Sequence, residues 1–298
     1  MNHERARRLR QQVKEQDLVV GVGAGTALEA KLVERAGFDF VWSSSLAVSA
    51  YHAVPDASLI SMHQYLEAAR AMTDVIDIPV IADCDTGYGN ANNVIYAVRL
   101  FEAAGIAAIS MEDKKFPKDN SLLAGGRQEL ATMEEFAGKI RAAKDHQRSS
   151  EFAIIARVEA LIAGWGEQEA LRRADCYAEA GADFILIHSK AATPDEVLSF
   201  AMHWHGPVPL VLVPTTYPSL TEAQVRESGR VKLLIYANHP LRAAVKGIQA
   251  ALAEIKRAGG IHSIEDQLVP VTEIFALQGV PEMKAREKRY LPRPGINS

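Results

Sequence analysis

The chain of 298 residues has little of what marks several classes of protein. Its only cysteines, Cys84 and Cys176, are not spaced as a metal-binding pair, and so few thiols are typical of a reducing compartment. No stretch approaches the roughly 20 consecutive apolar residues that cross a bilayer, and the Arg-rich segment from Met1 to Glu15 has no apolar core of a signal peptide. We therefore expect a cytoplasmic protein without a membrane partner.

An excess of positive charge is also missing. The chain has 33 basic and 37 acidic residues, for a formal net charge of −4. Nucleic-acid binding depends on a basic face that neutralises phosphates, so we expect no nucleic-acid partner. Hydrophobic residues, by contrast, make up 48% of the chain, which is enough for a large core.

One phrase recurs along the chain with variations: "ERAGFDFVWSS" ending at Ser44, "EAAGIAAISMED" ending at Asp113 and "AEAGADFILIHS" ending at Ser189. In each copy the spacing predicts a helix that ends at Ala-Gly, where glycine adopts the left-handed conformation of a C-cap. A short apolar run follows, as in a strand that is buried on both faces. Each copy therefore predicts a helix followed by a strand of a parallel sheet.

Further apolar runs bring the number of expected strands to eight. These runs are Leu18–Val22, Val80–Ala82, Ala153–Ala156, Leu210–Val213 and Leu233–Tyr236. Between them lie segments with helical spacing of apolar residues, at Tyr96–Ala104, Met133–Ala143, Gln168–Ala180 and Pro194–Met202. Eight alternating units favour a closed (β/α)₈ barrel of the TIM type. An open doubly wound sheet is disfavoured because "GVGAGTA" at 21–27 lacks the G-x-G-x-x-G spacing of a phosphate loop.

The chain continues beyond an eighth barrel helix. Helices are expected at Leu241–Ala258 and Val271–Leu277. We predict one barrel domain over residues 1–298, with 241–298 as a C-terminal helical extension. An apolar extension of this kind caps its own barrel or packs on a neighbouring subunit, and the second arrangement predicts a homo-oligomer.

Polar residues follow nearly every expected strand. They are Ser43-Ser44-Ser45, Asp83-Cys84-Asp85, Glu112-Asp113-Lys114, Arg157-Val158-Glu159, His188-Ser189-Lys190, Pro214-Thr215 and Asn238-His239. In a closed barrel the carboxyl ends of the strands converge on one mouth, where the active sites of this fold are built. The sequence therefore predicts one polar site at that mouth.

Carboxylates dominate one part of this site. Asp83, Asp85 and Glu112 follow neighbouring strands, and Asp56 lies in the preceding loop. Left bare, they would repel one another, and hard oxygen ligands without histidine or cysteine favour Mg²⁺, with Mn²⁺ as a substitute. Taken singly, Asp83 and Asp85 are explained as helix caps and Glu112 as a partner of Lys114. Taken together, the group favours a metal site.

Cationic groups face the carboxylates in this interpretation. Arg157 has the planar fork that binds a phosphoryl or carboxylate group in two places, and His188 donates to the same oxygens. Each also has a structural alternative, His188 as a core residue and Arg157 as a partner of Glu159. The segment from Phe116 to Gln128, "FPKDNSLLAGGRQ", has no helical or strand period and is expected to be a mobile lid.

Together, "DCDTGYGN", "MEDKKFPKDNS", "IARVEALIAGWG" and "ILIHSK" resemble the phosphoenolpyruvate mutase branch of the isocitrate lyase superfamily. The resemblance implies barrels whose eighth helix is exchanged between subunits, giving dimers or tetramers. It makes Asp83 the direct Mg²⁺ ligand, with Asp85, Glu112 and Asp56 acting mainly through metal-bound water. The remaining residues that it implies are Asp56, Lys118, Asn120, Arg157 and His188 for catalysis, and Ser44, Ser45, Leu46, Ser121 and Glu159 for substrate binding.

The resemblance implies interconversion of phosphoenolpyruvate and phosphonopyruvate, with a metaphosphate-like group moving between oxygen and carbon. The alternative is phosphonopyruvate hydrolase, which gives pyruvate and phosphate. Asn120 matches the mutase pattern, where the hydrolase carries threonine, whereas "AVPDASLISM", "GGRQEL" and "LVLVPTTYPSLTEA" are more similar to the hydrolase.

Two further alternatives are disfavoured. A carbon–carbon lyase of the superfamily would carry a "KKCGH"-type lid, and this chain has "KKFPKDNS". A barrel that only binds a ligand need not keep this full set of polar residues. The chain also departs from the family, with "WSSS" at 42–45 in place of W-G-S-G and Gly25-Thr26 in place of a His-Asn pair. The added side chains of Ser43 and Ser45 would narrow the carboxylate pocket.

Overall fold

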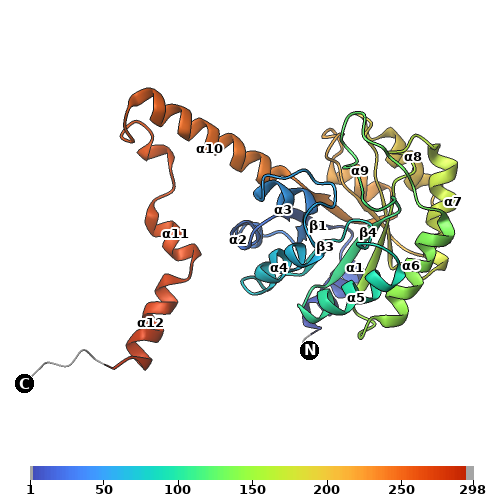
Figure 1. Ribbon diagram of the computed structural model, residues 1–298, viewed down its shortest axis with the longest axis horizontal. Coiled ribbons are helices and arrows are strands. Elements are labelled where there is room, and N and C mark those ends of the chain that lie inside the picture. Colours follow the sequence, from blue (N-terminus) through green and yellow to red (C-terminus); the bar gives the residue numbers. More distant parts are fainter. Residues whose placement is uncertain (1–2, 293–298) are drawn as a thin grey trace, which may run out of the picture. The chain divides into compact units, whose positions relative to one another are not determined.

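The computed structural model describes residues 3–292, and its internal contacts divide the chain between Leu241 and Arg242 into two units. The first unit is a closed barrel of eight parallel strands that follow one another in sequence order, surrounded by helices (Figure 1). The predicted (β/α)₈ barrel is therefore confirmed. Its strands are β1 (Val19–Ala24), β2 (Phe40–Ser43), β3 (Val80–Asp83), β4 (Ala108–Glu112), β5 (Ala153–Val158), β6 (Phe184–Ile187), β7 (Leu210–Leu212) and β8 (Val231–Tyr236).

Helices connect the strands of this unit. The helical segments expected around residues 96–104, 133–143, 168–180 and 194–202 correspond to α5, α6, α7 and α8. In full, the helices of the first unit are α1 (Glu4–Glu15), α2 (Ala27–Arg35), α3 (Ser45–Tyr51), α4 (Met62–Thr73), α5 (Ala91–Ala103), α6 (Met133–His146), α7 (Gly166–Glu179), α8 (Asp195–His203) and α9 (Glu222–Glu227).

The repeated Ala-Gly phrase forms the predicted turn in all three copies. Gly37, Gly105 and Gly181 have positive φ angles of 85°, 79° and 102°. A residue with a Cβ is strained in this left-handed region, which explains glycine at the point where each helix ends and the chain turns into its strand.

The barrel interior is filled by side chains that alternate along each strand. Phe40, Ile81, Ile155 and Leu186 belong to one buried cluster, and their neighbours in the sequence pack in a second cluster with the helices. Ala6 and Leu9 of α1 join the interior cluster. The first strand approaches its neighbours closely, since a Cβ at Gly23 would lie 1.8 Å from the carbonyl oxygen of Ala237.

The second unit contains most of α10 (His239–Ala258), a 3₁₀ turn (Glu265–Gln267), α11 (Val271–Leu277) and α12 (Val280–Tyr290). The helix predicted at 271–277 is confirmed with these bounds, and α12 was not predicted. None of the side chains of α10 is buried. The arrangement of residues 1–298 as a single domain with an extension stays a prediction, as does the exchange of a helix between subunits. In residues 3–292, no helix is long and apolar enough to cross a membrane.

Candidate active site

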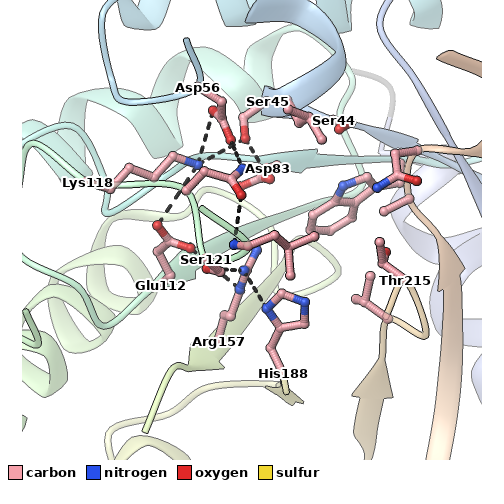
Figure 2. A pocket seen from close by; sticks show the side chains of 17 residues that line it. Ser44, Ser45, Asp56, Asp83, Glu112, Lys118, Ser121, Arg157, His188 and Thr215 are labelled. Atoms are coloured by element: carbon pink, nitrogen blue, oxygen red, sulfur yellow. Dashed lines mark hydrogen bonds and ion pairs between the residues drawn. The ribbon is translucent and has the colours of Figure 1, made fainter. Parts of the chain in front are cut away.

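A cavity opens at the carboxyl ends of the barrel strands, and Figure 2 shows the side chains that line it. Most of the residues predicted for the site meet here. Those that line the cavity are Ser44, Ser45, Leu46, Asp56, Asp83, Glu112, Lys118, Asn120, Ser121, Arg157 and His188. Asp85 and Glu159 do not line it and lie behind residues that do.

Strand alternation explains why these side chains converge. Asp83 lies two residues after Ile81, Arg157 two after Ile155 and His188 two after Leu186, and all three hydrophobic residues belong to the interior cluster. Side chains two residues apart on a strand point to the same face. These side chains therefore form the last layer of the barrel interior, at the level where the strands end.

The acidic side of the cavity surrounds the ammonium group of Lys118. Its Nζ lies 2.7 Å from Asp85 Oδ1, 3.3 Å from Asp56 Oδ1 and 4.0 Å from Glu112 Oε1. Burial alone would lower the pKa of Lys118, but the surrounding carboxylates, Asp85 first, raise it well above its usual range. The lysine is therefore charged, and it neutralises part of the acidic group.

The carboxylates themselves respond differently to burial. Burial raises the pKa of Asp85, and it raises the pKa of Glu112 to about 7 despite the opposing charge of Lys118. Burial also acts to raise the pKa of Asp56, but the charge of Lys118 and a hydrogen bond from Asn120 hold it below its ordinary value. The cluster has more acidic groups than one ammonium neutralises, which leaves it short of positive charge.

The acidic side of the cavity offers oxygen donors to a divalent cation. Within residues 3–292, no three His, Cys, Asp or Glu side chains are arranged to hold a metal by themselves. Asp56 Oδ1, Asp85 Oδ1 and Glu112 Oε1 are buried, and all three face the ammonium group of Lys118. Asp83 lines the cavity and accepts a hydrogen bond of 2.9 Å from Ser45 Oγ. These hard oxygens fit Mg²⁺, which takes one or two protein carboxylates and keeps several waters.

The cationic side is organised by Glu159, which is fully buried. Its carboxylate lies 2.5 Å from Arg157 Nε and 3.2 Å from Lys114 Nζ, and it accepts a hydrogen bond of 2.5 Å from Ser121 Oγ. Burial would raise the pKa of Glu159, but the charges of Arg157 and Lys114 hold it well below the usual range. Arg157 is therefore a partner of Glu159, as the structural alternative predicted, and it also lines the cavity, while its role in binding a substrate stays a prediction.

His188 lies beside this arginine. Burial first, and then the charge of Arg157, lower the pKa of His188, so the imidazole is neutral at pH 7. Arg157 Nη2 lies 2.8 Å from His188 Nδ1, a shorter contact than the 3.3 Å to Glu159. Because a guanidinium only donates, this nitrogen accepts, and Nε2 carries the hydrogen. His188 thus has one N–H donor that Arg157 does not use.

The segment from Phe116 to Gln128 has neither helix nor strand, as its lack of a helical or strand period predicted, and its role as a mobile lid stays a prediction. It leaves β4 and returns through an isolated antiparallel bridge between Lys114 and Leu130. Lys118 and Ser121 are buried, whereas Leu123 is 58% exposed. Asn120 Nδ2 donates to Asp56 Oδ2 over 2.7 Å. The segment therefore covers the cavity with its polar residues inward.

Thr215 and Asn238, two of the polar residues expected at the mouth because they follow strands, also line the cavity. Several other lining residues were not expected from the sequence. They are Trp42, Leu122, Val213 and Ala237. Their apolar side chains are indistinguishable from core residues in the sequence. The alternation of side chains along a strand could have indicated two of them. Val213 lies two positions after Val211, and Ala237 lies two positions after Ile235, so each points to the same face as a residue of the barrel interior.

A closed parallel barrel whose carboxyl end carries an acidic cluster, a cationic cluster and a covering loop has the arrangement of a TIM-barrel active site. The comparisons with known proteins narrow this class. The profile described as phosphoenolpyruvate phosphomutase matches residues 9–256. This chain therefore belongs to the phosphoenolpyruvate phosphomutase family, as its motifs indicated.

Its relatives carry two activities. The chain is 54% identical over 274 residues to a phosphonopyruvate hydrolase of Variovorax sp. (strain Pal2), covering 92% of this chain and 94% of that protein. It is 43% identical over 283 residues to a phosphoenolpyruvate phosphomutase of Tetrahymena pyriformis, covering 95% and 94%. It is thus an enzyme of the branch that contains both the mutases and the hydrolases.

Solved structures agree with this placement. A phosphoenolpyruvate phosphomutase from Streptomyces platensis subsp. rosaceus has a TM-score of 0.94 and 49% identity, covering 96% of this chain and 99% of that one. A phosphonopyruvate hydrolase in complex with oxalate and Mg²⁺ has a TM-score of 0.92 and 50% identity, covering 98% and 100%. The similarity to both is nearly equal, so the overall fold does not separate the two activities.

Proposed function

We propose that this enzyme is a Mg²⁺-dependent phosphoenolpyruvate mutase that interconverts phosphoenolpyruvate and phosphonopyruvate. Asp83 would hold the cation directly, with Asp85, Glu112 and Asp56 acting through metal-bound water, and Mn²⁺ would substitute. The cation would supply Lewis-acid stabilisation of the enolate of pyruvate. A related phosphonopyruvate hydrolase binds oxalate and Mg²⁺, which supports this choice of metal.

The two ends of the substrate would be held by opposite sides of the cavity. Ser44 and the backbone at Ser45 and Leu46 would hold the carboxylate end. Arg157 and the free N–H of His188 would bind the phosphoryl group and stabilise the charge that spreads over its oxygens in a loose transition state. The lid would complete this enclosure with Lys118, Asn120 and Ser121.

The observation that carries the choice of mutase is the position of Asn120. Its Nδ2 donates to Asp56 over 2.7 Å, and its Oδ1 accepts from the backbone N–H of Leu122 over 2.9 Å. Each polar end of the amide makes one of these hydrogen bonds, and an amide does not take up a proton at neutral pH. This side chain is therefore unsuited to activating a water against the phosphoryl group, and a dry site favours return of the group to the enolate.

Phosphonopyruvate hydrolase is the second candidate. The 54% identity to the Variovorax hydrolase, against 43% to the Tetrahymena mutase, supports it. Both reactions start from the same bound substrate and differ in whether one water reaches the phosphoryl group. The rest of the proposed site serves either reaction.

Phosphorus NMR of the protein incubated with phosphonopyruvate and Mg²⁺ tests the proposal. Phosphoenolpyruvate as the product supports the mutase, and inorganic phosphate together with pyruvate supports the hydrolase. A sample without Mg²⁺ and with a chelator is the control. Absence of turnover in the complete mixture would refute both candidates.

We also propose that the enzyme is a homodimer or homotetramer assembled through α10. Val245, Ile248 and Leu252 lie on one helical face and are 46%, 58% and 62% exposed. An apolar face of this kind is covered by another chain in many oligomers. Exchange of this helix between subunits would cover it.

A further inference from the structure

Lys114 is a buried cation outside the proposed catalytic set. Its side chain is 1% exposed, and it does not line the cavity. Its Nζ donates to Ser121 Oγ over 2.6 Å and to the backbone oxygen of Asp119 over 3.0 Å, and it lies 3.2 Å from Glu159 Oε2. A lysine at the base of the lid thus reaches both the tip of the lid and the residue that follows β5.

Ser121 Oγ is the atom that joins these contacts. It accepts from Lys114 Nζ and, over 2.9 Å, from Arg157 Nη2, and it donates to Glu159. We name Lys114, Ser121, Arg157 and Glu159 the lid latch. A hydroxyl has one hydrogen and two lone pairs, so all the hydrogen-bonding capacity of Ser121 is used within the latch. Charge-assisted bonds among buried groups are strong and directional.

We propose that Lys114 is a positioning residue, which latches the closed lid to the end of β5 and thereby sets the places of Ser121 and Arg157. This inference rests on the proposed function, because it assigns Lys114 to the phosphoryl end of that site. Lys114 also donates to the carbonyl oxygen of Asp119, which lies between Lys118 and Asn120 in the sequence. The same contact therefore helps to position these two side chains against the carboxylates of the acidic side.

Loss of the ammonium group has two consequences. The carbonyl of Asp119 and the hydroxyl of Ser121 lose a donor, so the lid opens more often. Glu159 loses one of its cationic partners, so the carboxylate that holds Arg157 and Ser121 is itself less firmly fixed. Misplacement of a catalytic group by about 1 Å costs on the order of 100-fold in rate. The Lys114→Met variant should therefore lose about 10- to 100-fold in kcat, with a smaller change in KM.

The neighbouring Lys115 provides a matched control. It lies on the same lid stem, but its side chain is 60% exposed and pairs with Glu129 over 3.3 Å. Lys115→Met removes the same charge from the adjacent position without touching the latch. Lys114→Arg restores the charge and the donors, and it should recover most of the lost kcat.

Hydrogen exchange of the lid amides, over residues 116–128, measures latching without substrate. Faster exchange in Lys114→Met than in Lys115→Met and the wild type is the expected result. Equal exchange in all three proteins, or a kcat of Lys114→Met within about twofold of Lys115→Met, would overturn the proposal. If Lys114→Met does not fold, Lys114→Gln, which keeps a donor, is measured with the same criteria. Failure of the wild type to turn over phosphonopyruvate would refute the proposed function. The hydrogen-exchange comparison needs no substrate, so it would still test whether Lys114 holds the lid.

Discussion

Replacement of Glu159 by glutamine perturbs the cationic side of the site at its centre. The variant keeps the shape of the side chain and an acceptor oxygen, but it removes the negative charge that faces Arg157 Nε at 2.5 Å and Lys114 Nζ at 3.2 Å. Both cations would then lack their main counter-charge in a buried environment. We expect a large loss of stability, although the residue does not touch the cavity.

The size of this loss follows from burial. Removal of one partner of a buried ion pair costs about 3 to 5 kcal/mol, because the other charge stays buried without compensation. Arg157 keeps a second carboxylate, Glu112 Oε2, 3.5 Å from its Nε, which places the cost at the lower end. We therefore expect the free energy of unfolding to fall by about 3 kcal/mol. Urea unfolding followed by circular dichroism, at one fixed protein concentration, measures it.

An exposed glutamate provides the control. Glu129 is 55% exposed and pairs with Lys115 over 3.3 Å. Surface pairs contribute little, so Glu129→Gln should change stability by less than about 1 kcal/mol. Equal losses in Glu159→Gln and Glu129→Gln would refute the reasoning that the buried carboxylate holds the cationic side together.

The stability difference between the wild type and Glu159→Gln depends on pH with a definite sign. The pKa of Glu159 lies well below its usual range, so the carboxylate contributes stability above the unfolded pKa of about 4.3. That contribution is lost only as the pH falls through the folded value. The stability difference between the wild type and Glu159→Gln should thus not shrink from pH 7 to pH 5, since over this range Glu112, whose pKa is about 7, loses the charge that compensates Arg157 in the variant. A difference that disappears between these values would contradict the assignment.

Three further predictions concern the proposed metal site, the barrel and the proposed assembly. Asp83→Ala should abolish Mg²⁺-dependent turnover and the Mg²⁺-induced rise in melting temperature while leaving the metal-free protein folded, and unchanged turnover would exclude Asp83 from the site. Gly23→Ala places a Cβ 1.8 Å from the carbonyl oxygen of Ala237 and should cost at least about 3 kcal/mol in urea unfolding, whereas wild-type stability would show that β1 relaxes easily. Leu252→Asp, on the exposed face of α10, should lower the mass measured by light scattering, and an unchanged mass would exclude this face from the proposed assembly.

The barrel itself was predictable from local patterns. Each Ala-Gly turn requires a left-handed glycine, and each strand that follows is a continuous apolar run because both of its faces are buried. The site was predictable to the extent that it follows the strands, since parallel strands in a barrel end at the same mouth. Asp83, Glu112, Arg157 and His188 line the cavity for this reason.

The orientation of each side chain was decided only by the tertiary structure. Asp85 and Glu159 lie just after β3 and β5, two residues beyond Asp83 and Arg157, yet they do not line the cavity and instead contact residues that do. Trp42, Val213 and Ala237 line the cavity but have the composition of core residues. Lys114 and Lys115 are adjacent and chemically identical, and only one of them is buried against the lid. The sequence by itself determined which groups reach the mouth, because strand ends are a local property. The hydrogen-bond and ion-pair partners of these groups come from segments far apart in the chain. These segments meet only when the barrel closes, so the sequence alone did not reveal the pairs.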